Sequence, residues 1–420
     1  MKTVHFKSFG CKVNQYETQA LRELFLGAGF CENGGSNSDI YIVNSCSLTK
    51  NTDRKVRQYI EKKRQASSKS RIFVSGCGVF NPESGLEKIG GIEIFKGLDK
   101  RELFKKIAGV KSDYPFRGIK SFQGRERAFA KVQDGCDNFC SYCVIPYLRG
   151  GPVSRSSEQI LTEIENLVDN QYKEIVVCGI NLGAYGLGQD ENLTGLLKKI
   201  LAIKKDFRLR LSSMGPNYVS EELIDMMAEN KKLCPHFHLP LQSGDDKILK
   251  LMKRKYSISD YFHLLDKIRK KVKDVAITTD VLIGFPQESE ENFKNTLKAI
   301  EKGRFLKTHI FSYSRREKTA SAKLKDHLSR KVIIERRREA QVMAEGISYL
   351  FRKNFVNKTL NVLIEKRKNK ETSRNFGFTD NYIEVQVDVP DYLINTIKAV
   401  RIIEVKIDKN VAVLAEKRPK

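Results

Sequence analysis

Short apolar stretches alternate with amphipathic ones through the first hundred residues. Residues 4–9, 39–44 and 71–76 (VHFKSF, DIYIVN and RIFVSG) are short, apolar and bounded by polar or turn residues, which is typical of β-strands. Residues 17–30, between the first two, carry apolar side chains at helical spacing until Gly29 ends the pattern. Strands that alternate with helices predict a parallel sheet covered on both faces.

A second alternating series follows a polar segment, residues 111–127, which is rich in glycine and basic residues and is a predicted linker. Six apolar stretches in this series predict strands, with helical patterns between them. Six β/α units favour a partial barrel over the closed barrel of eight units. The predicted strands are residues 127–133, 173–179, 207–213, 236–242, 274–284 and 305–314.

The last part of the chain changes character. Residues 329–354 form a basic helical stretch, and residues 357–420 contain short β-rich segments separated by turn residues. Several short strands within about sixty residues predict a small barrel, a module often used on nucleic acid. The predicted strands there are residues 357–365, 382–388, 396–408 and 410–416. The predicted fold class is α/β, with a first α/β domain over 1–112, a central partial (β/α)6 barrel over 127–354 and a small β-barrel over 357–420.

Charge and composition narrow the function classes. The 420 residues include 76 Lys and Arg against 51 Asp and Glu, a formal net charge of +25. Such an excess favours a polyanionic partner, because Lys and Arg contacts to phosphate dominate nucleic-acid affinity, although a generally basic proteome would explain it equally well. No stretch of eighteen apolar residues predicts a membrane span, and the first residues lack the apolar core of a signal peptide. We therefore expect a cytoplasmic protein with no membrane partner.

Nine cysteines in a cytoplasmic chain favour metal binding or catalysis over a disulfide framework. Cys11, Cys46 and Cys77 each follow one predicted strand of the first domain. Because the carboxyl ends of parallel strands form the ligand crevice of an open sheet, these three could meet there. The alternative is three structural cysteines in a core.

Cys136, Cys140 and Cys143 are spaced C-x3-C-x2-C directly after a predicted strand. Three thiolates in one loop can ligate three irons of a [4Fe–4S] cluster, which ordinarily takes four cysteines, so one iron stays open to a ligand. Structural zinc is the alternative, but it prefers paired ligand motifs, and no fourth cysteine or histidine lies nearby. A ferredoxin that only carries electrons has no need of an open iron.

This spacing is the signature of the radical S-adenosylmethionine (SAM) superfamily, and the chain resembles the radical SAM methylthiotransferases over nearly its whole length. The motifs that carry the resemblance span all three predicted domains. They are GCKVNQYET, NSCSLT and SGCGVF in the first; CSYCVIPYLRG, HFHLPLQSG, TTDVLIGFPQES and FSYSRRE in the second; and VLIE with FTDNYIEVQVDVP in the third. The resemblance implies a flavodoxin-like first domain, a radical SAM barrel and a C-terminal TRAM domain that binds RNA.

Within the family, GCKVNQYET, CGINLGAYG and RLRLSS are most similar to the branch that acts on threonylcarbamoyladenosine in tRNA. The branch acting on isopentenyladenosine typically has Gln-Met after the first Gly-Cys, and the branch acting on a ribosomal protein has Pro-Lys; Lys12 and Val13 fit neither. Two positions depart from the branch, which usually has Glu in place of Gly215 and Gly in place of Lys318. Both departures bear on the substrate more than on the reaction.

The resemblance also implies site residues. Cys136, Cys140 and Cys143 would hold the cluster whose open iron is chelated by SAM, which is cleaved to a 5′-deoxyadenosyl radical. Cys11, Cys46 and Cys77 would hold an auxiliary [4Fe–4S] cluster that carries the transferred sulfur. The remaining cysteines, Cys31, Cys178 and Cys234, match no ligand motif and are predicted to be structural. The residues predicted to line the SAM pocket are Tyr142, Gly179, Asn181, Ser213, Gln242 and Ile283.

The implied activity is addition of a methylthio group to carbon 2 of N6-threonylcarbamoyladenosine next to the anticodon. The implied partners are the anticodon stem-loop of tRNA, an electron donor and a sulfur source. Alternatives are methylthiolation of isopentenyladenosine in tRNA or of a ribosomal protein, and a non-catalytic iron–sulfur protein that binds RNA.

Other polar residues carry weaker expectations. Arg149 and Arg155 follow the second cysteine motif and either neutralise a carboxylate or phosphate or lie solvated on the surface. The six histidines show no ligand spacing, and of His236 and His238 we expect only one to face inward.

Overall fold

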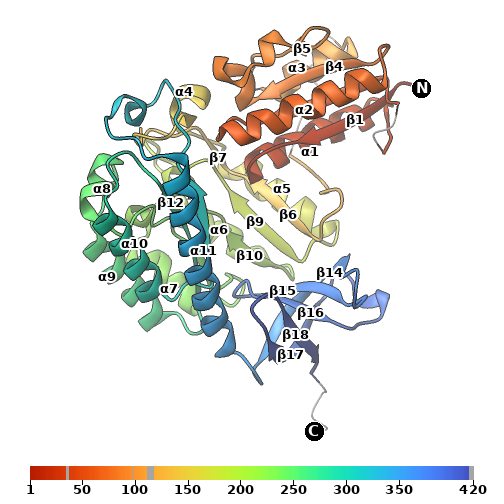
Figure 1. Ribbon diagram of the computed structural model, residues 1–420. Helices are drawn as coiled ribbons and strands as arrows, with labels where there is room; N and C mark the ends of the chain where they lie inside the picture. The colour runs from red at the N-terminus through yellow and green to blue at the C-terminus, as the bar shows by residue number, and fades with distance from the viewer. Residues whose placement is uncertain (35–36, 98, 111–117, 416–420) are drawn as a thin grey trace.

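The computed structural model describes residues 1–34, 37–97, 99–110 and 118–415. Three units follow one another from top to bottom in Figure 1: an α/β layer, a partial barrel and a small closed barrel. The first part of the predicted linker, residues 111–117, lies outside the described residues. No described helix is both long enough and apolar enough to cross a membrane.

The first unit is a parallel sheet of five strands in the order β2-β1-β3-β4-β5. All six residues of β3 are buried, so this strand is the centre of the sheet. The three predicted strands are confirmed, and the fold class with them. The strands are β1 (Thr3–Ser8), β2 (Cys31–Glu32), β3 (Ile40–Ser45), β4 (Arg71–Gly76) and β5 (Glu93–Ile94); the helices are α1 (Lys12–Gly27), α2 (Lys50–Ala66) and α3 (Lys100–Ala108), with 3-10 turns η1 (Cys77–Phe80), η2 (Pro82–Ser84) and η3 (Leu86–Lys88).

Helix α1 begins five residues before the predicted start. Cys11 is its N-cap and makes no side-chain capping hydrogen bond, so none of the usual capping signals marks this end in the sequence. The early start places Lys12 in the first helical turn, immediately after Cys11.

The second unit contains the six predicted strands of the partial barrel. They form two parallel three-stranded sheets, β10-β9-β6 and β11-β12-β13, which single bridges join between β10 and β11. The strands are β6 (Arg127–Lys131), β9 (Glu174–Cys178), β10 (Arg208–Leu211), β11 (His236–His238), β12 (Ala276–Ile283) and β13 (Lys307–Ser312), with a small hairpin of β7 (Gln133–Asp134) and β8 (Val153–Ser154).

Helices cover the outside of this barrel, and the largest apolar core lies between them and the strands, with Val177, Leu209 and Ile277 among its most buried members. The 24-residue helix α11 packs along α10 and β13 and runs down to the third unit (Figure 1). The helices are α4 (Ile145–Arg149), α5 (Ser157–Asp169), α6 (Leu193–Leu201), α7 (Glu221–Glu229), α8 (Asp246–Leu251), α9 (Ile258–Lys271), α10 (Glu290–Gly303) and α11 (Arg330–Lys353), with 3-10 turns η4 (Leu182–Ala184), η5 (Pro216–Tyr218) and η6 (Ala320–Lys323).

The third unit is a closed barrel in the order β14-β15-β16-β18-β17. Its predicted strands are present, but β15 was not predicted, because NFGFT contains an asparagine and a glycine that disfavour a strand. The elements are β14 (Thr359–Lys368), β15 (Asn375–Thr379), β16 (Glu384–Val387), η7 (Asp391–Leu393), β17 (Ile397–Val405) and β18 (Asn410–Leu414). Residue 416, at the end of the last predicted strand, lies outside the described residues.

Buried ion pairs join the second and third units. Arg208 and Arg210 of β10 both bind the carboxylate of Glu174 on β9, at 2.6 and 2.8 Å. The same guanidinium groups donate to backbone carbonyls of the small barrel. Burial would raise the pKa of Glu174, but the charges of Arg210 and Arg208 outweigh it and hold that pKa well below its ordinary value. This cluster fixes the small barrel against the side chains of β10.

Candidate active site

Cys11, Cys46 and Cys77, which we call the N-terminal triad, lie together at the carboxyl edge of the first sheet. Each follows a different strand, and all three are free thiols. Gly10 has a φ of 104°, and a Cβ atom there would lie 2.8 Å from the sulfur of Cys46. Glycine therefore lets the loop before Cys11 approach Cys46 closely. The predicted meeting of these cysteines at one sheet edge matches this arrangement.

Arg149 connects the N-terminal triad to the second unit. Its Nε donates to the sulfur of Cys77 at 3.0 Å, and its other nitrogens bind Glu17 and Asp134 at 2.9 and 2.7 Å. Burial raises the pKa of the Cys77 thiol, and the Arg149 charge opposes that rise. The side chain of Arg149 is 1% exposed, so the expectation of a solvated arginine is wrong here.

Arg155 is also paired. It donates to Glu163 at 2.5 Å and to the hydroxyl of Tyr16 at 3.0 Å, which joins the barrel to α1. Both arginines therefore neutralise buried carboxylates between the first two units.

Cys136, Cys140 and Cys143, the central triad, occupy the loop between β7 and α4. Burial is the main cause that raises the pKa of Cys143 to about 12, and the neighbouring sulfurs contribute. Arg254 donates to the sulfur of Cys140 at 3.2 Å. The loop thus brings three sulfurs together beside a cation, and metal binding would displace their protons.

A cavity of about 300 Å³ opens beside the central triad and is lined by all three of its cysteines. Leu48 and Thr49, which follow Cys46 closely in the chain, line the same cavity from the first unit. The cavity therefore lies between the loops that carry the two triads.

Four of the six residues predicted for the SAM pocket line this cavity: Tyr142, Asn181, Ser213 and Gln242. Asn181, Ser213 and Gln242 follow barrel strands that end at the same mouth of the barrel, as the predicted topology requires, and Tyr142 belongs to the loop of the central triad. The other two are placed differently. Gly179 begins the loop after β9 without lining the cavity, and Ile283 is fully buried in the apolar core while its neighbour Leu282 faces the cavity.

A group of histidines and an aspartate lies deeper in the barrel. Ligand atoms of His238, Asp280 and His309 lie within 4.8 Å of one another, and His238 Nε2 is 3.1 Å from Asp280. The expectation that only one of His236 and His238 faces inward is wrong, since both contact the hydroxyl of Thr278. Residues two apart in a strand share a face, which the spacing alone could have shown.

Comparison with known proteins identifies the family. Residues 131–300 match the radical SAM superfamily model, and residues 3–96 match a model described as uncharacterized protein family UPF0004. A protein from Bacillus subtilis (strain 168), named threonylcarbamoyladenosine tRNA methylthiotransferase MtaB, is 32% identical over 96% of this chain and 94% of its own length.

The chain belongs to the radical SAM methylthiotransferases. A second member, from Thermodesulfovibrio yellowstonii and named tRNA-2-methylthio-N(6)-dimethylallyladenosine synthase, is also 32% identical, over 97% of this chain and 96% of its own length. The solved structure of the radical SAM methyltransferase TsrM from Kitasatospora setae, with cobalamin and a [4Fe–4S] cluster bound, has a TM-score of 0.57 at 15% identity and covers 77% of each chain. At that identity it supports the fold alone.

Both triads of this methylthiotransferase fit an iron–sulfur cluster. Each offers three free, converging sulfurs, and an arginine donates to one sulfur of each triad. Arg254 was missed in the sequence because nothing in MKRKY separates a buried arginine from the exposed basic residues beside it. The one indication of its role is its place in the chain, because Arg254 follows α8 and lies close to the mouth of the barrel.

The two positions where this methylthiotransferase departs from its branch differ in environment. Gly215 lines the cavity, and the atoms nearest to a Cβ placed there belong to the side chains of Asn217 and Tyr218. Lys318 is exposed, in the loop after β13. Gly215 is therefore the departure that can affect ligand binding.

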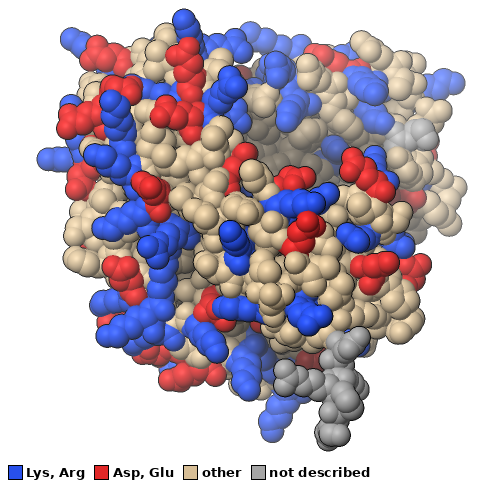
Figure 2. All heavy atoms as spheres, turned by 60° about the horizontal axis from the view of Figure 1, so that its bottom comes forward, with Lys and Arg blue, Asp and Glu red and all other residues tan. Residues whose placement is uncertain are grey.

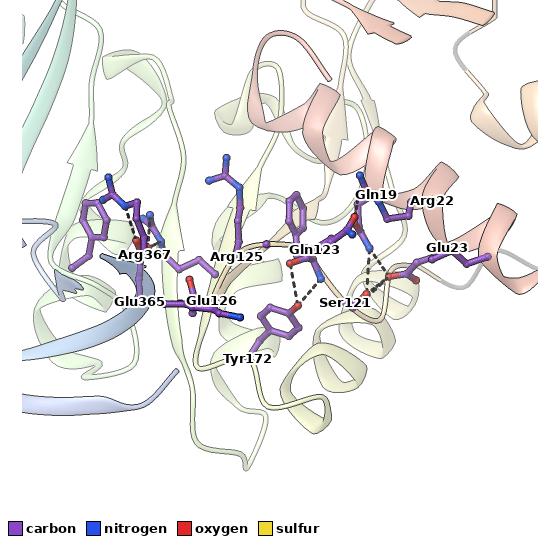
Figure 3. Close-up of a pocket in the computed structure, with 16 residues that line it drawn as sticks. Gln19, Arg22, Glu23, Ser121, Gln123, Arg125, Glu126, Tyr172, Glu365 and Arg367 are labelled. Carbon is purple, nitrogen blue, oxygen red and sulfur yellow. Dashed lines mark hydrogen bonds and ion pairs between the residues drawn. The ribbon is translucent and has the colours of Figure 1, made fainter. Parts of the chain in front are cut away.

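A larger cavity of about 970 Å³ lies where the three units meet (Figure 3). Arg22 of α1, Arg125 of the segment before β6 and Arg367 of β14 all line it, with Lys366 beside them. Arg125 reaches into the space between the first and third units, and its guanidinium lies over the Phe129 ring. This cavity, which we call the junction groove, is lined by five basic side chains and by the three carboxylates of Glu23, Glu126 and Glu365.

Proposed function

We propose that this chain adds a methylthio group to carbon 2 of N6-threonylcarbamoyladenosine next to the anticodon of tRNA, forming the 2-methylthio derivative. The observation that carries the proposal is the full-length similarity to proteins named for that activity, from Bacillus subtilis and others. The domain organisation supports it, since two cysteine triads flank one cavity and a small barrel follows. We place the protein in the cytoplasm, where tRNA is modified.

The cofactors that this function requires are SAM and two [4Fe–4S] clusters. The central triad would hold the cluster that binds SAM, and the N-terminal triad would hold the auxiliary cluster. When bound, these groups supply the electron that cleaves SAM and the sulfur that is transferred. Arg254 and Arg149 would stabilise the negatively charged sulfurs, and the burial of Cys46 and Cys77 would keep water away from those two ligands.

The four residues that line the cavity support its assignment as the SAM pocket: Tyr142 from the loop of the central triad, and Asn181, Ser213 and Gln242 from the segments that follow β9, β10 and β11. Asn181 donates to the hydroxyl of Tyr218, which in turn donates to Asn138 beside the central triad. This chain of hydrogen bonds would hold the amide of Asn181 in place for a polar part of SAM.

The junction groove is the proposed contact with the anticodon stem-loop. It draws basic side chains from all three units, so an RNA bound there would contact the small barrel and the α/β unit at once. Figure 2 shows Lys and Arg side chains gathered widely on the face that carries the small barrel, with a hollow in its upper part. A net charge of +25 supports a polyanionic partner. An electron donor and a sulfur source complete the proposed partners.

The test is nucleoside mass spectrometry of tRNA from a strain that lacks this protein. We expect threonylcarbamoyladenosine to accumulate and its 2-methylthio derivative to disappear, while methylthio-isopentenyladenosine stays at its normal level. Loss of the isopentenyl derivative instead would assign the chain to the alternative function. That alternative has one observation in its favour, the 32% identity to the dimethylallyladenosine synthase.

A further inference from the structure

His238, Asp280 and His309, which we call the histidine–aspartate group, come from three neighbouring strands of the partial barrel. The strands are β11, β12 and β13, which pair in parallel in that order. Asp280 lies directly opposite His309 in the register of β12 with β13. His238 lies opposite Thr278, which is two residues before Asp280 and therefore shares its face of the strand. The pairing of the strands thus brings the three side chains to one patch on one face of the sheet.

The ligand atoms of this group are close to one another. Two imidazole nitrogens and one carboxylate oxygen all lie within 4.8 Å of one another. Nε2 of His238 is 3.1 Å from the carboxylate of Asp280. Two neighbouring ligands, each about 2.1 Å from one metal ion, lie about 3.0–3.4 Å apart. This pair therefore has the spacing of neighbouring metal ligands, although the same spacing also suits a hydrogen bond.

The hydrogen bonds around the group favour a metal ion over a purely structural role. In the part of the chain that the structure describes, His238 is the one side-chain partner of the Asp280 carboxylate. Neither ring nitrogen of His309 forms a hydrogen bond there, although the ring is partly buried. Polar groups inside a protein are normally hydrogen-bonded, so a structural group would use these lone pairs. They are instead available to a ligand.

The second ring nitrogen of His238 has the partner that a metal ligand needs. Nδ1 lies 2.9 Å from the hydroxyl of Thr278. A histidine bound to a metal ion usually donates its other ring N–H to a neighbouring acceptor, which fixes the tautomer and the orientation of the ring. With the proton on Nδ1, the lone pair of Nε2 faces the carboxylate of Asp280. A cation between the two groups would bind both.

The group lies beside two cavities of the barrel. Asp280 lines the cavity of about 300 Å³ that the central triad also lines. His309 lines a second cavity, of about 390 Å³, between β13, α11 and the small barrel. An ion held by the three side chains would therefore have protein on the side of the sheet and open space on the other. Its remaining coordination positions are available to water or to an oxygen atom of a bound ligand.

We propose that His238, Asp280 and His309 bind a divalent first-row transition-metal ion in a site that shares no ligand with either cysteine triad. Two imidazoles and one carboxylate with open positions are the ligand set of mononuclear non-haem iron(II) sites. Nitrogen and oxygen ligands give this site a different metal preference from the thiolates of the triads. The inference concerns a third metal centre and holds whichever adenosine derivative is modified.

The experiment measures Mn²⁺ binding to the enzyme with both iron–sulfur clusters assembled, without oxygen, SAM or RNA. Mn²⁺ is the probe because it prefers nitrogen and oxygen ligands and competes poorly for thiolates. The electron paramagnetic resonance signal of aqueous Mn²⁺ gives the unbound concentration. The variants are Asp280→Asn and His309→Ala. The controls are Asp266→Asn and His263→Ala, which remove an exposed aspartate and an exposed histidine of α9.

We expect the wild type and both controls to bind one Mn²⁺ per chain. Asp280→Asn and His309→Ala should each weaken this binding by more than about tenfold, because a change in a residue that only supports a metal ligand already costs about 10–100-fold. Iron content should stay at the wild-type value in all four variants. A wild type without stoichiometric Mn²⁺ binding would overturn the inference, as would wild-type affinity in both Asp280→Asn and His309→Ala.

Pulsed electron paramagnetic resonance of Mn²⁺ bound to the wild type is a second measurement, and it needs no variant. Hyperfine coupling to imidazole nitrogen is expected, because histidine provides two of the three protein ligands. A bound ion with oxygen ligands alone would lie at some acidic surface site and would overturn the inference. If the variants lost iron as well as Mn²⁺, this measurement would decide alone. The nucleoside analysis described above tests the proposed function separately.

Discussion

At the residue scale, the chemistry depends on contacts that no short motif encodes. The cysteines could be found from their spacing, but the arginines that donate to Cys77 and Cys140 come from distant parts of the chain, 72 and 114 residues away. Sequence spacing identifies metal ligands because they share a loop or a sheet edge. It does not identify the neighbours that tertiary packing brings to them.

Arg149→Met should weaken the auxiliary cluster while the central one remains. The substitution removes the hydrogen bond to Cys77 and one of the two cations paired with Glu17, so that Lys131 remains as the other. Iron analysis should give about half the wild-type content, since one cluster of two is lost, and SAM cleavage should persist. Arg155→Met is the control, because Arg155 is also paired with a buried carboxylate, although its side chain is more exposed, and it contacts no sulfur in the described structure. Full iron content in Arg149→Met would contradict the prediction.

Gly215→Glu tests the departure that lines the cavity. A carboxylate there can accept hydrogen bonds from ribose hydroxyls, so we expect SAM to bind about tenfold more tightly. Lys318→Gly, at the exposed departure, should leave SAM affinity unchanged. Equilibrium binding of SAM to the reconstituted enzyme measures the affinity of both variants. If Gly215→Glu bound SAM with the wild-type affinity, this position would not contact SAM.

At the scale of elements, the sequence predicted strands better than helix ends. Every predicted strand of the α/β unit and the partial barrel is present, because short apolar runs bounded by polar or turn residues form strands more readily than helices. The start of α1 and the strand β15 were missed. Cys11 gives α1 no capping signal, and β15 forms through pairing with both neighbours in a closed barrel despite a poor strand sequence.

The RLRL sequence of β10 shows the same limit. Its alternation predicts a strand, but not that Arg208 and Arg210 would share one buried carboxylate with carbonyls of another unit. Glu174→Gln should destabilise the protein at pH 7 by about 3–5 kcal/mol, because two buried guanidinium groups lose their counter-charge. Denaturation of the metal-free protein measures the loss. The control Glu222→Gln removes an exposed partner of Lys198 and should cost less than about 1 kcal/mol.

The pH dependence of the free energy of unfolding gives a second test of the ion pairs between Glu174 and the two arginines. The pKa of Glu174 is lower in the folded state than its ordinary value of 4.5, so the unfolded chain binds more protons below that pH. The stabilisation is fully present above pH 4.5 and is lost as the pH falls below it. The difference in stability between wild type and Glu174→Gln should therefore shrink on acidification. A difference that stays constant would show that the pKa of Glu174 is not lowered in the folded protein.

At the scale of the whole molecule, two spaces lie between units: the cavity between the triads, lined by the first two units, and the junction groove, lined by all three. The junction groove could not be predicted from sequence, because it takes its residues from separate units. The barrel side of the cavity between the triads was predicted in part, but its wall from the first unit, Leu48 and Thr49, was not. This arrangement explains why one chain contains all three units. A base removed from the anticodon loop loses its stacking, at a cost of a few kcal/mol, and phosphate contacts in the groove would offset that cost.

Arg125 and Lys366 provide the test of this arrangement. Both line the junction groove, and neither side chain forms an ion pair within the described structure, so each is available to a phosphate. Replacing either with Met should weaken tRNA binding similarly for every RNA sequence, and should reduce the slope of log affinity against log salt by about one unit. SAM cleavage without tRNA should be unchanged, since neither residue lines the cavity beside the central triad. If the double variant kept the wild-type slope, tRNA would have to bind another face, and the base would have to enter the barrel by a route other than the junction of the three units.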